Sequence, residues 1–495
     1  MIPEPKPYPA YKDSGMKWLG KVPKGWEVKK LRQVTRLIVS NVDKKSSDSE
    51  VPVRLCNYVD VYNHEVITED LFFMQATATK EEIRKFAVKR GDVAITKDSE
   101  IWNDIGVPAY VNCEAPNLIY GYHLAILRPL ANALEGKYLF RTLQSQPVAT
   151  QLHIEATGVT RFGLSQQAIK SVQIPLPPLP EQRAIVKFLD WADRRRRLII
   201  AALKKRIQLL EEYRQTLIND AVTGKFDVRT GKPYPGYKDS GVEWLGKVPK
   251  HWEVRRLSSL AQSRIKNGVG EKARDYKEDW PRYIRITDIK NTFALHEHNK
   301  ASLPPEIARQ AIVKKGDLLF AAVGATYGKA YLYLGESEKA CFAGYLVKWS
   351  PTNDVDPKWA AYWTFSETYW NQVHSGVIKA TIENFSASRY RNLLFALPPL
   401  PEQRAIAEYL DRETRKIDAA IEKTKKSIEL WEELRTALIA DVVTGKLDVR
   451  EVAEKLPEEE PELEAKIEAL EASLKENGRM AEEEKPEAEP AEEPA

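Results

Sequence analysis

The sequence predicts an α+β protein: two mixed α/β domains separated by a pair of long antiparallel coiled-coil helices, with an internal pseudo-two-fold repeat. Three observations lead to this prediction. The 24 residues that begin at Tyr8 return at Tyr234 with 18 identities, and the 15 that begin at Leu176 return at Leu397 with 12 identities. The two inserts between these repeats share almost no extended identity. Such long-period self-similarity indicates one scaffold written twice around two different inserts.

The second repeat of each copy predicts a long helix. Its Leu-Pro-Pro-Leu-Pro opening cannot be helical, because proline lacks the N–H donor, although the last proline suits a helix start. Apolar residues then recur at steps of three, four or seven from Glu181 to 223–224 and from Glu402 to 444–445, which is the pattern of an amphipathic helix ending at Thr-Gly. We expect two helices of about 38 residues, ~57 Å long, each of which needs the other to cover its apolar stripe.

The order of the repeats sets the expected domain boundaries. The repeat is circular, so the N-terminal stretch is expected to pack near the C-terminal end of the second helix. An antiparallel helix pair would place the two domains at opposite ends, whereas a parallel pair would place them together. The expected segments are 1–180 (N-terminal segment and first domain), 181–222 (first long helix), 223–401 (linker, repeated Trp segment and second domain), 402–444 (second long helix) and 451–495 (acidic tail).

The two inserts share landmarks although they lack extended identity. Short β-branched and aromatic runs bounded by Gly-Asp, Pro and Asn are typical of strands, and each insert continues into a helical pattern. Each insert is therefore expected to be one mixed α/β domain of the same fold with divergent loops. The matching strands are 53–61 with 283–291, 86–96 with 311–321 and 121–129 with 343–351, and the helices lie near 136–151 and 357–373.

Charge is divided unevenly along the chain. The net charge is +4, but residues 451–495 contain 17 Glu and 5 Lys or Arg, which leaves 1–450 at +16. A body this basic favours a polyanion such as DNA, although large proteins also carry such charge without binding DNA. The tail is expected to be mostly disordered apart from one amphipathic stretch at 463–474. It is expected to be a solubilising tail, with masking of the basic body or contact with a partner as the alternatives. The four arginines at 194–197 are expected to form a solvated face.

Motifs for catalysis and targeting are missing from the sequence. It contains no phosphate-binding GxxxxGK[ST], HExxH, nucleophile elbow, DPPY-type tetrapeptide or convincing nuclease core. Three cysteines without CxxC argue against disulfides or structural zinc, and suit a reducing cytoplasm. No signal peptide or membrane-spanning run appears at the N-terminus or in the helices. The residues therefore predict a cytoplasmic binding protein with no catalytic or metal-binding residues.

Three loops in each insert carry the small, polar and basic side chains suited to phosphates and base edges. They follow the Gly-Asp strand, precede the proline motif, and precede the first landmark strand. The alternative to a DNA-binding role for each of these residues is that it is an ordinary surface residue. The candidate DNA-binding residues are Lys44, Lys45, Thr96, Lys97, Ser99, Thr160 and Arg161 in the first insert, and Arg264, Lys266, Thr326, Tyr327, Lys329, Lys379 and Arg389 in the second.

The repeated motifs resemble those of the specificity subunit of type I restriction–modification enzymes. The resemblance covers about residues 8–450 and is carried by WLGKVPKGWEV (18–28), WLGKVPKHWEV (244–254) and both copies of LPPLPEQRAI (176–185 and 397–406). It implies that the inserts are target recognition domains, each reading one half of a bipartite double-stranded DNA site. It further implies that the helices set the spacer and dock two modification (methyltransferase) subunits.

The same resemblance assigns the chemistry to partners. S-adenosylmethionine, ATP and Mg are expected in the modification and restriction subunits, with no cofactor in this chain and no membrane partner. The residues that match the shared motif, and are candidates for partner docking or a structural role, are Glu181, Gln182, Arg183, Glu402, Gln403 and Arg404. The alternatives are a complete methyltransferase or nuclease, a coiled-coil scaffold that reads no DNA, and the DNA-recognition subunit of another methylation-based defence system.

Overall fold

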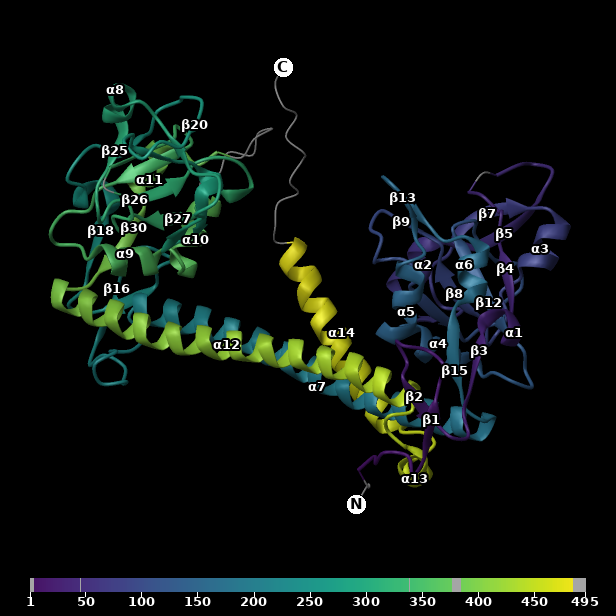
Figure 1. The fold of residues 1–495 in the computed structure, drawn as a ribbon. Coiled ribbons are helices and arrows are strands. Elements are labelled where there is room, and N and C mark those ends of the chain that lie inside the picture. The colour runs from purple at the N-terminus through teal and green to yellow at the C-terminus, as the bar shows by residue number, and fades with distance from the viewer. Residues whose placement is uncertain (1–3, 45, 338, 376–383, 484–495) are drawn as a thin grey trace. The chain divides into compact units, whose positions relative to one another are not determined.

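The computed structural model describes residues 4–44, 46–337, 339–375 and 384–483. These divide into two compact units: Met1–Ala202 with Lys426–Glu471, and Leu203–Lys425 with Ala472–Ala495. Each unit contains one insert domain and one part of each long helix (Figure 1). The α+β class with two mixed domains and two long helices is confirmed.

The first domain is built on a five-stranded sheet in which the central strands are antiparallel. Apolar strands fill it: every residue of Val93–Thr96 is buried, as are the first four residues of the neighbouring strand. In sheet order the strands are β4 (Thr35–Val39), β12 (Leu124–Pro129), β8 (Val93–Thr96), β10 (Pro108–Val111) and β6 (Val66–Ile67). Two smaller sheets are β11 (Leu118–Tyr120), β5 (Val51–Cys56), β7 (Met74–Ala78), and β13 (Thr157–Gly158), β14 (Phe162–Gly163), β9 (Asp98–Ser99).

The second domain repeats this topology. Its central strand β29 (Leu346–Trp349) lies between β19 (Lys266–Asn267) and β26 (Leu318–Ala321), as β12 lies between β4 and β8. Strand β21 (Arg282–Ile284) pairs in parallel with β28 (Ala340–Phe342), as β5 does with β11. The inserts therefore share one fold, as their landmarks predicted. The main sheet is β19 (Lys266–Asn267), β29 (Leu346–Trp349), β26 (Leu318–Ala321), β27 (Ala330–Leu332), and the other is β20 (Arg274–Asp275), β24 (Ala301–Ser302), β21 (Arg282–Ile284), β28 (Ala340–Phe342), β25 (Ile312–Val313).

Three short helices recur in each domain. They are α4 (Gly136–Gln144), α5 (Gln146–His153) and α6 (Gln166–Ser171) in the first, and α9 (Pro357–Trp363), α10 (Glu367–Ser375) and α11 (Ala387–Asn392) in the second. The single helix expected at 136–151 is broken at Ser145, which is extended, because Pro147 in the first turn of α5 cannot continue the preceding ladder of hydrogen bonds. The repeated scaffold adds two-stranded ribbons: β3 (Glu27–Lys30) with β15 (Gln173–Leu176), and β18 (Glu253–Arg256) with β30 (Leu394–Leu397).

The long helices α7 (Leu179–Val222) and α12 (Leu400–Val443) have 44 residues each, about 66 Å at 1.5 Å per residue. Each begins two residues before the expected Glu181 or Glu402, because the missing N–H of its last proline costs nothing in the first turn. The antiparallel pairing is confirmed. In the first unit, Arg196 of α7 contacts Glu432 of α12 at 2.8 Å, and in the second, Arg214 contacts Asp418 at 2.7 Å.

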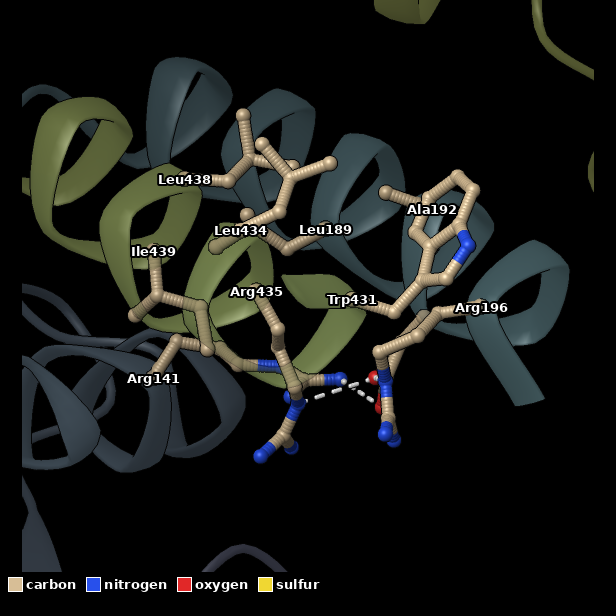
Figure 2. Close-up of a pocket in the computed structure, with 10 residues that line it drawn as sticks. Arg141, Leu189, Ala192, Arg196, Trp431, Leu434, Arg435, Leu438 and Ile439 are labelled. Carbon is tan, nitrogen blue, oxygen red and sulfur yellow. Dashed lines mark hydrogen bonds and ion pairs between the residues drawn. The ribbon is translucent and has the colours of Figure 1, made fainter. Parts of the chain in front are cut away.

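The contact between the long helices of the first unit is organised around Asp193, and Figure 2 labels Arg141, Arg196 and Arg435, whose guanidinium groups approach it. Arg435, Arg196 and Arg141 approach its carboxylate to 3.0, 2.9 and 3.4 Å. Burial alone would raise the pKa of Asp193, but these three guanidinium groups outweigh it and hold that pKa below its ordinary value. A small cavity of about 70 Å³ beside them is lined by apolar side chains that include Leu189. Charge and apolar packing therefore both join α4 to the helix pair.

The circular closure of the scaffold is also confirmed. Gly445, just past the end of α12, has φ +79°, and an added Cβ would lie 2.3 Å from a ring carbon of Pro23. Lys6 pairs with Asp448 in an antiparallel bridge. Gly224 stands in the same relation to Pro249 in the second unit, at 2.6 Å. The N-terminal repeat of one copy therefore closes on the last turn of a long helix.

The acidic tail differs from the expectation. Residues 450–483 are mostly helical, in α13 (Arg450–Lys455) and α14 (Pro461–Glu483). The amphipathic stretch expected at 463–474 lies within α14, whereas the disorder expected around it is wrong for α13 and for both ends of α14; residues 484–495 lie outside the described residues. The arginine run is not a solvated face, because tail glutamates contact it: Arg195 binds Glu460 and Arg197 binds Glu464, both at 2.6 Å. Spacing revealed the helix but not its ion pairs, which join residues about 265 positions apart. In the described part of the chain, no helix has the length and apolarity needed to cross a membrane.

Candidate nucleic-acid interface

The candidate loops of the first domain emerge from one end of its main sheet. Strand β12 pairs antiparallel with both β4 and β8, so Leu124 lies opposite Thr96 and Ala125 opposite Val39. The segments that leave these strands stay together through backbone hydrogen bonds: Tyr122 N–H donates to the Val42 carbonyl at 3.0 Å. Loops 40–44, 97–106 and 121–123 therefore form one surface.

The structure joins two candidate segments that are about 60 residues apart in the sequence. Ser99 of β9 pairs with Phe162 of β14, and β14 pairs with β13. The Leu164 N–H donates to the Lys97 carbonyl at 2.9 Å. Segments 97–99 and 157–163 are thus one three-stranded sheet, which presents Thr160 and Arg161 beside the loop that follows β8.

A chain of polar side chains holds Arg161 at this surface. His123 Nδ1 lies 2.8 Å from the Asp98 carboxylate, and Nη2 of Arg161 lies 3.3 Å from His123 Nδ1 and 3.4 Å from His123 Nε2. Lys97 Nζ is 3.7 Å from the same carboxylate. Because Arg161 is exposed, its remaining N–H groups are available to a ligand.

The sequence analysis missed several aromatic side chains that are exposed or partly exposed on α2 and on the loops of this domain. Tyr58 and Tyr62 stack at 5.5 Å on α2 (Tyr58–Asn63), and Tyr62 donates to Asp104 at 2.8 Å. Trp102 and Tyr122 are 50% and 36% exposed. The sequence placed residue 58 in a strand expected at 53–61, whereas α2 puts Tyr58 and Tyr62 on one helix face, so their four-residue spacing became informative only with the structure. Aromatic faces beside cations suit stacking on bases or packing on sugars.

The other candidates of the first domain have different environments. Thr96 is fully buried and its hydroxyl accepts from Val107 N–H at 3.0 Å, and Ser99, 7% exposed, accepts from Ile101 N–H at 3.2 Å. These two side chains shape the loop and offer almost no surface to a ligand. Their prediction as DNA-binding residues is therefore wrong. Lys44 is exposed, and its charge acts on Asp60. Lys45 lies outside the described residues.

The second domain gathers its candidate loops at the equivalent end of its sheet. Ala321 lies opposite Leu346, and Asn267 opposite Val347. The Asn267 side-chain amide donates to the Gly344 carbonyl at 2.9 Å. Segments 264–267, 322–329 and 343–345 therefore meet, as their counterparts do in the first domain.

Aromatic side chains fix the loop 322–329. Tyr390 donates to the Ala321 carbonyl at 2.7 Å, and Tyr369 donates to the Gly328 carbonyl at 2.5 Å. Gly328 has φ +81°, and an added Cβ would lie 2.7 Å from the Trp370 ring, so only glycine fits. Tyr327 Oη lies 3.0 Å from His374 Nδ1. This loop is therefore held rigidly, as a surface that reads a ligand requires.

The candidate side chains of the second domain lie around this loop. Lys329 and Arg264 are exposed, and Thr326, Tyr327 and Arg389 are partly exposed. Lys266 donates to the Gln310 carbonyl at 3.1 Å, so its ammonium is tied along the sheet edge. Lys379 lies outside the described residues. Sequence reasoning missed Tyr345, which is 66% exposed between the converging loops.

The repeated Glu-Gln-Arg segments at 181–183 and 402–404, which were candidates for partner docking, are mostly buried. Gln182 is fully buried: its carbonyl accepts from Glu135 N–H at 2.9 Å, and its amide donates to the Ala133 and Pro177 carbonyls, both at 2.9 Å. Gln403 repeats all three bonds in the second unit, with Asp356, Asp354 and Pro398 at 2.7, 2.9 and 2.8 Å. These glutamines join each domain to its helix and have no surface for a partner.

The glutamates of the motif are internal as well. Glu181 accepts from Tyr8 Oη at 2.6 Å, and Glu402 accepts from Trp252 Nε1 at 2.8 Å and from Tyr234. Burial and the hydrogen bond to Glu181 raise the pKa of Tyr8. The selection of six docking residues is thereby corrected, because only Arg183 and Arg404 are exposed. Within residues 4–44, 46–337, 339–375 and 384–483, no three His, Cys, Asp or Glu side chains cluster as metal ligands.

Comparisons with known proteins agree with this architecture. The model of the type I restriction modification DNA specificity domain matches residues 23–209 and 249–430. The MjaVIII specificity subunit of Methanocaldococcus jannaschii is 22% identical over 450 residues (89% of this chain, 97% of that protein). The EcoKI specificity subunit of Escherichia coli K12 is 21% identical over 458 (88% and 92%).

Solved structures show the same fold. A chain from a type I R-M system superimposes with a TM-score of 0.64 at 19% identity, covering 86% of this chain and 99% of its own. The HsdS subunit from Thermoanaerobacter tengcongensis gives 0.52 at 18% identity, covering 86% and 98%. Both halves of the doubled scaffold are matched, and the chain belongs to the family of type I restriction–modification specificity subunits.

Proposed function

We propose that this chain reads a bipartite double-stranded DNA site, one half with each domain. One observation carries the proposal: two copies of one domain, in nearly identical frames, differ in the loops at the same end of their main sheets. A repeated frame with unlike reading surfaces suits an asymmetric two-part target. The net charge of +16 over residues 1–450 supplies attraction to phosphates.

The helices and partners complete the proposal. A continuous helix of 44 residues has a constant length, so it suits a ruler for the unread spacer between half-sites. The repeated scaffold offers two equivalent surfaces, on which Arg183 and Arg404 are exposed, for two methyltransferase subunits. These partners would supply S-adenosylmethionine chemistry, and restriction subunits would supply ATP- and Mg-dependent steps. The complex would act in the cytoplasm.

Exchange of residues 32–175 for the corresponding insert of a relative with another target tests this proposal. Methylome sequencing of cells that express the chimaera with its modification subunit should show a split motif in which one half alone has changed. A change in both halves, or in neither, would contradict modular reading. A scaffold that reads no DNA predicts no motif at all, and a complete methyltransferase predicts S-adenosylmethionine binding by the isolated chain.

Arg161→Ala is expected to weaken binding to the native site. Loss of a base contact would cost about 1–3 kcal/mol and relax preference at one position, whereas loss of a phosphate contact would lower the salt slope by about one. Titration of the native duplex at several salt concentrations, together with single-base variants, distinguishes the two roles. Arg183→Ala is the matched control, because it removes an exposed arginine that pairs with Glu135 away from the loops. Equal effects of both variants would mean that Arg161 contributes only net charge.

A further inference from the structure

The acidic segment 458–471 lies over a row of basic side chains on α7. Glu460 forms a bidentate pair with Arg195, with both distances at 2.6 Å, and also contacts Arg194 at 3.3 Å. Arg197 is bound by Glu464 at 2.6 Å and by Glu471 at 3.0 Å. The row continues to Lys187, which contacts Glu458 at 2.6 Å. Four carboxylates thus neutralise four cations of one helix.

The glutamates that contact α7 flank an apolar strip that holds α14 in place. Ile467 is fully buried, and Leu463 and Leu470 are partly buried on the same helix face. The Arg195 guanidinium lowers the pKa of Glu460, so this carboxylate stays ionised at neutral pH. The opposite face of the segment carries Glu462 and Glu468, which are exposed.

The acidic segment 458–471 has no counterpart over the second long helix of the repeated scaffold. The counterparts of Arg194, Arg195 and Arg197 in the second copy are Arg415, Lys416 and Asp418 on α12. Their side chains are 78%, 65% and 53% exposed. Among the described residues, no acidic helix covers these three side chains of the second unit. The cover therefore has a role other than completing the coiled coil.

The covered face of α7 is turned toward the first domain. Arg194, Arg197 and Glu464 line a cavity of about 440 Å³ together with Tyr110 and Lys137 of that domain. Lys137 is also exposed, and its ammonium lies 5.8 Å from the Tyr110 ring centre. A polyanion bound by the first domain and extending along α7 would meet these cations.

We propose that segment 458–471 imitates the DNA backbone on this face, and that double-stranded DNA competes with it for Lys187, Arg194, Arg195 and Arg197. Carboxylate and phosphate both accept two parallel N–H bonds from a guanidinium, so the same arginines bind either group. The inference rests on the proposed DNA-reading function. The segment suppresses binding to random sequence and yields to a duplex that the domains hold by specific contacts.

Two triple variants of equal charge test the competition. E460Q/E464Q/E471Q removes the carboxylates that contact the arginines, and E459Q/E462Q/E468Q removes three on the exposed side. Titration of the full chain with a random-sequence 40-bp duplex should show binding about ten-fold tighter for the first triple. Its salt slope should rise by about two to three, because about three further phosphates are contacted. The second triple should change affinity about two-fold.

Truncation provides the second variant. A chain ending at Leu456 keeps α13, whose Val452 and Leu456 are buried in the first unit's core, and should match or exceed the first triple. Adding R194Q/R195Q/R197Q to the truncated chain should return the affinity to that of the full chain. Equal affinities of the two triples would overturn the proposal, as would tighter binding of the modification subunit with unchanged DNA affinity. Domain exchange reports separately on the proposed function.

Discussion

Replacement of Asp92 by alanine is expected to destabilise the first domain by about 3–5 kcal/mol, the range for removing one member of a buried ion pair. Asp92 is 1% exposed, directly before β8. Both of its oxygens accept from Arg128 at 2.7 Å, and one also accepts from Tyr120 Oη at 3.0 Å. Alanine would leave the Tyr120 hydroxyl buried without this acceptor, and Arg128 without its counter-charge.

Hydrogen exchange measured strand by strand checks this result, because it reports on each domain separately. Amides of β8 and β12 should lose protection in Asp92→Ala, while β26 and β29 keep theirs. Asp317→Ala is the matched control in the second domain. Asp317 is 3.5 Å from Lys348, which also donates to the Ile312 carbonyl at 2.8 Å, so this change should cost only about 1–2 kcal/mol. Equal losses in both domains would contradict the role assigned to the Arg128 pair.

Gln182→Ala is expected to destabilise the joint between the first domain and α7 by about 3–4 kcal/mol. Three buried hydrogen bonds to backbone groups are lost, each worth about 1 kcal/mol, and a cavity is created. Gln403→Ala should have the same effect in the second unit, because its three bonds have the same pattern.

Exchange protection at α4 and at the start of α7 should fall in Gln182→Ala, with the centre of the first domain's sheet less affected. Arg183→Ala changes the next residue, which is exposed and pairs with Glu135 at 2.7 Å, and should cost under about 0.5 kcal/mol. If Gln182→Ala lowered protection throughout the domain's sheet but not at α4 and the start of α7, the glutamine would stabilise the domain core and not its attachment to α7. Retained protection at both places would show that the three bonds contribute little.

The scaffold was predictable because its signals are local and repeated. Proline runs, apolar spacing and Thr-Gly stops specify helices by backbone chemistry within a few residues. Both copies of the repeat carry the same signals, so each helix was predicted twice. Gly445 and Gly224 illustrate the limit: the repeat indicated a circular closure, but only the structure shows a Cβ meeting Pro23 or Pro249 there. Gln182 and Gln403 stood in a recognised motif, yet their burial depends on backbone atoms more than 45 residues away.

The candidate interface was predictable by segment and less so by side chain. The Gly-Asp strand patterns located the loops after β8 and β26. Thr96 and Lys97 are adjacent in the sequence, yet Thr96 is fully buried and Lys97 is partly exposed. Exposure depends on which strand lies opposite, and so on pairing across the sheet. The contacts among Asp98, His123 and Arg161 join residues up to 63 positions apart, and no local sequence pattern predicts them.

By itself, the sequence determined that this protein is one frame built twice around two unlike inserts, because repetition and periodicity are properties of the chain order. Tertiary structure alone decided which of its charges are available. Arg161 is held at a surface by His123, whereas Arg195 and Arg197 are neutralised by glutamates of the acidic tail, for which the sequence predicted one amphipathic stretch but none of these ion pairs. The physical reason is that the availability of a charge depends on which opposite charge lies within about 4 Å, and folding brings such partners from distant parts of the chain.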